Sequence, residues 1–185
     1  LSYFIIPIFY NKEEIRSFLK NQVSKKYEID IKFNEKISYG LFPKPFFYTK
    51  NLDIIHEKKI LGNSNSVKFY ISFTNFFSLK KIKIQDLVFR NTEFEINANN
   101  INFFKKTLYS NEKENKVFFK KSKFFYKSED EELLFLSKIS DLNFFYDEKN
   151  NLQKVKTDFE IFNVPFKLIV NKNFDNKDKN LELIS

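Results

Sequence analysis

Few residues of this 185-residue chain have the type and spacing that catalysis or metal binding requires. His56 is the only histidine and cysteine is absent, so paired-histidine sites, thiolate metal sites and histidine-activated nucleophiles lack their usual partners. Gly40 and Gly62 are the only glycines, which excludes a recognisable glycine-rich phosphate loop. We therefore expect no enzymatic activity, no catalytic residue, no cofactor and no metal.

Two charged segments could still bind a ligand. The acidic run 129–132 lacks the alternating ligands and the glycine of a calcium loop, so we interpret it as a solvated turn. In segment 116–127, lysines are interleaved with aromatic residues, as binding of single-stranded nucleic acid by base stacking requires. An ordinary β-strand explains the same pattern, and the glycine-containing signature of the common RNA-binding sheet is missing. We expect no nucleic-acid partner and keep a basic-aromatic nucleic-acid-binding module as the less favoured alternative.

The composition is that of a folded chain with an unusual residue usage. Hydrophobic residues make up 42% and charged residues 30%, which argues against wholesale disorder. There are 26 Phe, no Met and no Trp, a bias typical of AT-rich genomes, in which lysine is also frequent. The net charge of +8 is therefore weak support for an anionic partner, since the lysines are interspersed with acids and asparagines.

The chain begins with an apolar stretch. Residues 1–10 carry no charge, and a helix needs roughly 20 apolar residues to cross a hydrocarbon core. Because the first residue is not methionine, we interpret this stretch as the end of a truncated transmembrane anchor, with Tyr3 and Tyr10 at interfacial depth. A buried strand or the remnant of a signal peptide is the alternative.

An amphipathic helix is predicted over residues 11–26. Asn11 and Glu14 have the spacing of an N-cap and its reciprocal acid. The apolar residues that follow lie on one helical face: Ile15, Phe18, Leu19 and Val23.

From Tyr27 onward the hydrophobic period changes to two, which predicts strands with one apolar face each. We expect residues 27–185 to form one antiparallel β domain, incomplete at its C-terminus, with polar breaks that include 62–65, 97–100, 111–115, 128–132, 147–151 and 171–179. Only one short helix is available to cover at least six apolar strand faces, so a second sheet, an apolar groove or a layer outside these residues must cover them. The candidate residues for lining such a groove are Ile29, Ile31, Phe69, Ile71, Phe94, Ile96, Phe144, Phe159, Ile161, Phe166 and Leu168.

The order of these features resembles the beginning of AsmA-family proteins. The helix, the strand at 27–33 and the entry Pro43-x-Pro45 into a long strand are similar in order and spacing to that family, and segment 72–96 is similar to its next portion. The sequence departs from the family pattern at Thr92, where a proline is expected, and after Ile96. The similarity covers roughly residues 3–108.

The resemblance implies a mostly β fold in which a long antiparallel sheet curls into an apolar groove. It also implies one N-terminal anchor in a bacterial inner membrane, a β domain in the periplasm, and a groove that binds or conducts phospholipid acyl chains and contributes to outer-membrane biogenesis. Envelope protein partners are unknown. The alternative is a structural β domain that binds another protein along a strand edge.

Overall fold

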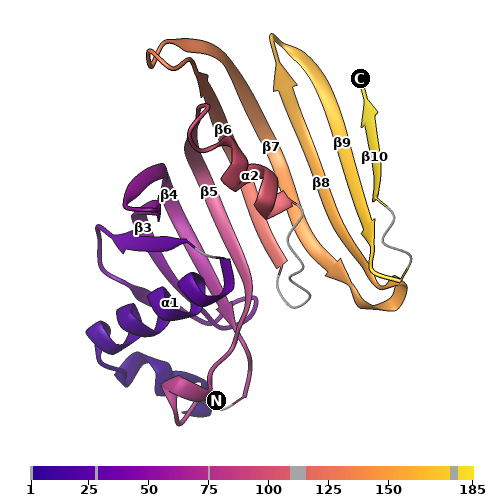
Figure 1. Cartoon of the computed structure of the whole chain (residues 1–185). Helices are drawn as coiled ribbons and strands as arrows, with labels where there is room; N and C mark the ends of the chain where they lie inside the picture. The colour runs from indigo at the N-terminus through magenta and orange to yellow at the C-terminus, as the bar shows by residue number, and fades with distance from the viewer. Residues whose placement is uncertain (1, 28, 75, 109–115, 176–178) are drawn as a thin grey trace.

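The fold is built on one ten-stranded sheet. The computed structural model describes residues 2–27, 29–74, 76–108, 116–175 and 179–185. The sheet has the strand order β1-β3-β4-β5-β6-β7-β8-β9-β10 (Figure 1). Strand β2 is beside β1 and pairs with residues 46–48 of β3, whereas β1 pairs with residues 52–55. All pairs are antiparallel except β5 and β6. The prediction of a mostly β, largely antiparallel fold behind an N-terminal helix is therefore confirmed.

The predicted amphipathic helix is α1, Lys12–Tyr27. Asn11 caps it, since its side-chain oxygen accepts hydrogen bonds from the backbone N–H groups of Glu13 at 2.8 Å and Glu14 at 3.4 Å. One face of α1 is buried against the sheet through Ile15, Leu19 and Val23. The helix therefore covers the N-terminal part of the sheet.

The apolar start forms a 3₁₀ helix, η1 (Ser2–Phe9), that packs onto the chain between β4 and β5. The Tyr3 ring stacks on Phe76 with a centroid distance of 5.1 Å, and the Tyr3 hydroxyl accepts a hydrogen bond from the Phe76 backbone N–H at 3.0 Å. Within the part of the chain that the structure describes, no helix combines the length and the apolar character needed to cross a bilayer.

The N-terminal strands are β1 (Asp30–Phe33), β2 (Ser38–Gly40), β3 (Phe46–His56), β4 (Lys59–Ile71) and β5 (Ile84–Ile96). Residues 62–65, expected to be a break, lie inside β4, and the turn is at Glu57 and Lys58, which both have positive φ. Gly62 is needed there because a Cβ would overlap the Glu93 carbonyl oxygen on β5. Strand β5 begins at Ile84, after the 3₁₀ turn η2 (Leu79–Lys81).

Helix α2, Ile101–Leu108, lies between β5 and the parallel strand β6 (Lys116–Lys127). It begins directly after the predicted break at 97–100. Its Phe104 ring meets Phe94 of β5 edge-on at 5.7 Å and Phe124 of β6 at 5.9 Å. Helix α2 therefore covers the junction between the two halves of the sheet.

The remaining strands form an antiparallel meander: β7 (Leu133–Asp147), β8 (Leu152–Ile161), β9 (Val164–Asn173) and β10 (Lys179–Ile184). The breaks expected at 128–132 and 147–151 are turns, the second containing η3 (Glu148–Asn150). Strand β9 extends to Asn173, so the predicted break at 171–179 begins later than expected, and the break at 111–115 lies outside the described residues. Phe162 and Asn163, both with positive φ, form a hairpin turn that was not predicted, because it contains no glycine.

The sheet is open, and the strong curl expected from the sequence is not observed in it (Figure 1). Helices α1 and α2 lie on the same face of the sheet, over its N-terminal half and its centre, while no described helix lies over β8, β9 or β10. The two halves of one sheet face therefore have different surroundings.

A row of buried hydroxyl groups crosses the face of the sheet on which α1 and α2 lie. It runs through the positions where the strand ladders are interrupted. Thr49, Ser64, Thr92 and Ser122 come from four adjacent strands and are at most 2% exposed. The Thr92 hydroxyl donates to Ser64 Oγ at 2.9 Å, and the Thr92 N–H donates to Ser122 Oγ at 3.3 Å. These bonds satisfy polar groups that burial would otherwise penalise.

Candidate functional site

The candidate functional site is the apolar side of strands β7–β10. Residues paired across a ladder point to the same side of a sheet, so the registers define rows on this surface. One row is Phe144, Val155, Val170 and Leu181, and the next is Leu142, Thr157, Leu168 and Leu183. We call this surface the open apolar face and define it by Ile139, Leu142, Phe144, Val155, Phe159, Ile161, Phe166, Leu168, Val170, Leu181 and Leu183.

The open apolar face is buried at its centre and exposed at its margins. Val155 on β8 is 1% exposed, whereas Leu181 on the edge strand is 63% exposed. Phe159 stacks on Phe166 with a centroid distance of 5.5 Å, and both rings are only partly buried. An exposed hydrophobic surface of this kind is typical of a binding site.

Ten of the eleven candidate groove residues lie on strands and point to one side of the sheet, as their registers show. Ile29 precedes β1 and packs against the core. The candidates fall into two groups. Those before β8 are buried in the core: Ile31, Phe69, Ile71, Phe94, Ile96 and Phe144. Those on β8 and β9 keep part of their surface exposed: Phe159, Ile161, Phe166 and Leu168.

Two polar residues on the same face were missed by the sequence analysis. Gln153 and Thr157 alternate with Val155 on β8 and are only 2% and 7% exposed. Among the described residues, the side-chain nitrogen and oxygen of Gln153 have no hydrogen-bond partner, and neither has the hydroxyl group of Thr157. Extending the period-two pattern backward from Phe159 would have placed both on the apolar side.

The opposite side of the sheet carries lysines in cross-strand ion pairs. Lys123 Nζ lies 2.9 Å from Glu93 Oε1, and Lys127 Nζ lies 2.9 Å from Glu95 Oε2. Phe119 and Phe124, which are sequence neighbours of lysines, point to the other side and stack on Phe89 and Phe94 at 4.8 Å and 5.0 Å. Three of the five aromatic residues in segment 116–127, namely Phe119, Phe124 and Tyr126, are thus separated from these lysines by the sheet.

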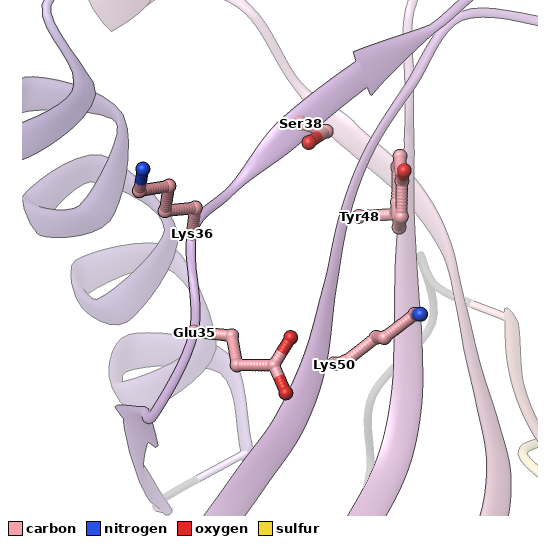
Figure 2. A pocket seen from close by; sticks show the side chains of 5 residues that line it. All are labelled: Glu35, Lys36, Ser38, Tyr48 and Lys50. Atoms are coloured by element: carbon pink, nitrogen blue, oxygen red, sulfur yellow. The ribbon is translucent and has the colours of Figure 1, made fainter.

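A shallow polar pocket lies beside β2 and β3 (Figure 2). It is lined by Glu35, Lys36, Ser38, Tyr48 and Lys50. Figure 2 shows Lys36 turned toward α1, away from the Glu35 carboxylate. The lining has no histidine beside Ser38, so it lacks the base that activates a serine nucleophile.

His56 lies at the end of β3 and is packed against α2. Its ring centroid is 4.3 Å from that of Phe103, and its Nε2 is 3.8 Å from the Glu57 carboxylate. Among the residues that the structure describes, no three histidine or carboxylate side chains are close enough together to hold a metal ion.

Comparison with known protein families finds no family that matches this chain, and comparison with curated proteins finds no matching relative.

Proposed function

We propose that this chain binds the acyl chains of phospholipid on its open apolar face, as an AsmA-like, membrane-anchored protein of the bacterial envelope that contributes to outer-membrane biogenesis. One observation carries the proposal: apolar rows continue across β8, β9 and β10, where no described helix covers them. Because the sheet is not strongly curled, the lipid would lie along a broad face rather than inside a deep groove.

The driving force would be burial of apolar surface, without a catalytic group. Each acyl methylene removed from water contributes about 0.8 kcal/mol. Partly exposed side chains such as Phe159, Phe166 and Leu168 would lose their remaining contact with water at the same time. The polar head would stay near solvent. The order of helix, strand and Pro43-x-Pro45 entry supports placing this activity in an AsmA-like protein.

The test is native mass spectrometry of the full chain purified from a bacterial envelope, with lipid extraction of the same sample. We expect co-purified phospholipid, and its loss in Phe166→Asp, which places a charge on the open apolar face. Lys167→Asp is the matched control, because its side chain points to the opposite side of β9. Absence of phospholipid from the wild-type chain would refute the proposal.

The second candidate function is protein binding along the edge of β10, where the strand order of the described sheet ends. Leu183 and Ile184 are 57% and 47% exposed, and an edge strand offers unpaired backbone groups to another strand. The Phe174 N–H donates to the Asn151 carbonyl oxygen, so alternation along β9 turns Ile169 and its partner Glu182 into the β9–β10 ladder and leaves the Leu183 N–H at the free edge. Leu183→Pro therefore removes a backbone donor from this edge, keeps an apolar side chain there and leaves β8 unchanged. Loss of a cross-linked protein partner with retention of phospholipid would favour this function over the first.

A further inference from the structure

The open apolar face has one polar end. The row nearest the β7–β8 turn consists of Tyr146, Gln153 and Lys172, in register on β7, β8 and β9. The rows beyond it are apolar apart from Thr157 and Ser137, and the hairpin at the far end exposes Phe162 and Val164. From Gln153 to Ile161 the strand extends about 26 Å at roughly 3.3 Å per residue. This surface is thus amphiphilic along its length.

Gln153 lies between two aromatic residues. Tyr146 is its partner on β7, and Phe174 directly follows β9 on the other side of β8, which places the two backbones about 10 Å apart. Their ring centroids are nevertheless only 5.8 Å apart, so the rings lean toward each other across β8. Lys172 Nζ lies 5.2 Å from the centroid of the Phe174 ring. The Gln153 amide is therefore enclosed by side chains on its own side of the sheet.

The amide makes no hydrogen bond with any residue that the structure describes, through either its nitrogen or its oxygen, although Gln153 is 2% exposed. Unpartnered buried amides are uncommon because burial without a hydrogen bond costs stability. A leucine or methionine would fill the same space without that cost. The amide offers two donors and an acceptor, so a hydroxyl group, which can accept and donate, satisfies it with a single atom.

We propose that the Tyr146–Gln153–Lys172 row binds the hydroxyl-bearing head of an acyl lipid, whose tail lies along the open apolar face toward Phe162. This inference rests on the proposed function, and it adds a direction for the lipid and a chemical preference for its head. Gln153 exchanges hydrogen bonds with the head hydroxyl. Tyr146 and Phe174 close over it, and Lys172 places a positive charge beside it. The lipid enters when the Phe174 ring moves away from Tyr146.

The test compares two ligands with the same tail in displacing a fluorescent fatty-acid probe from the full chain. A monoacylglycerol carries head hydroxyls, and the methyl ester of the same fatty acid can only accept hydrogen bonds. We expect the wild-type chain to prefer the monoacylglycerol by about five- to tenfold, the range of one or two neutral hydrogen bonds. Gln153→Met is expected to abolish this preference, with Gln153→Leu as a second variant.

Thr157→Val is the matched control, because it removes the other unpartnered hydrogen-bonding side chain from the same side of β8, away from the polar row. It should keep the wild-type preference. Urea denaturation of each variant separates loss of binding from loss of folding. Equal affinity of the wild-type chain for both ligands, or a preference that survives in both Gln153 variants, would overturn the inference while leaving the proposed function intact. Failure of both ligands to displace the probe would refute both.

Discussion

The two halves of this sheet are built from similar alternating strands but are stabilised differently. In the β1–β5 half, α1 and the buried Phe76 cover the apolar side, and Phe47, Val67 and Phe69 are at most 1% exposed. In the β6–β10 half, the same side carries Phe159 and Phe166, which keep part of their surface in contact with solvent. The difference lies in what covers the strands, because the strand pattern itself continues across both halves.

This comparison shows how one sheet can have both a covered core and an apolar side over which no described helix lies. The covered half has enough buried apolar surface to stabilise the fold. The strands of the open half, β6–β10, are joined to the covered half by backbone hydrogen bonds to β5. The ion pairs and turn contacts of the open half lie mostly on its polar side. Its apolar side is the surface on which we propose that lipid binds.

The largest expected contrast is between two phenylalanines on the same side of the sheet. Phe69→Ala should lower the free energy of unfolding by about 3–5 kcal/mol, because Phe69 is 1% exposed and its removal leaves a cavity. Phe166→Ala should cost about 1 kcal/mol, since solvent or neighbouring side chains can fill the space. Urea denaturation monitored by circular dichroism measures both. Equal losses would show that the two halves are packed alike.

Substitutions that enlarge a side chain should also affect the stability of the two halves of the sheet differently. Gly62→Ala places a methyl group against the Glu93 carbonyl oxygen and the Phe94 ring, so we expect a loss of about 1–3 kcal/mol. Val164→Ile, on the open half, should change stability by less than about 0.5 kcal/mol, because Val164 is 46% exposed. Thermal denaturation of the two variants is sufficient. A neutral Gly62→Ala would mean that β4 and β5 can move apart without cost.

A third comparison is between two buried threonine hydroxyl groups, one in each half of the sheet. Thr92→Val removes the hydrogen bond to Ser64 and should cost about 1 kcal/mol. Thr157→Val removes a hydroxyl with no partner among the described residues, so it should leave stability unchanged or raise it slightly. Both are measured by urea denaturation. Equal destabilisation by the two substitutions would indicate that Thr157 has a partner in solution.

The smallest expected effect is a pH dependence in the open half. Lys154 donates to the Asp147 carboxylate at 2.6 Å, and this bond, together with one from Asn150, lowers the pKa of Asp147 from 3.8 to about 2. A lowered folded-state pKa contributes stability that is present above pH 3.8 and lost as the pH falls to about 2. Carboxyl titration by nuclear magnetic resonance should give this pKa, and Lys154→Met should raise it. An unchanged pKa in Lys154→Met would rule out Lys154 as the main cause.

Much of the fold could be predicted from local patterns, because the patterns are strong. The Asn11 cap and the spacing of Ile15 and Leu19 predicted α1, and alternation predicted most strands. Segment 62–65 was misread because its Gly, Asn and Ser residues favour turns, whereas pairing with β3 and β5 holds it in a strand. The turn at Phe162 has no glycine and gave no local signal.

The candidate site was less predictable, because it depends on coverage rather than on pattern. Alternation identified the apolar residues on each strand but could not say that Phe69 is covered while Phe166 is not. That difference depends on where α1 and α2 pack. The unpartnered state of Gln153 likewise follows from the neighbours that registers place beside it.

The parallel pairing of β5 with β6 has a consequence for folding kinetics. Most antiparallel ladders can form outward from a short turn, such as the one that joins His56 to Lys59, whereas every pair of the parallel ladder, such as Asp86 with Lys116, is 30 residues apart. Contacts between residues far apart in sequence form slowly, because the entropy of loop closure is lost before they form. The two meanders should therefore assemble first and join last. In hydrogen exchange, the amides of the β5–β6 ladder would then gain protection after those of β3–β4 and β7–β8.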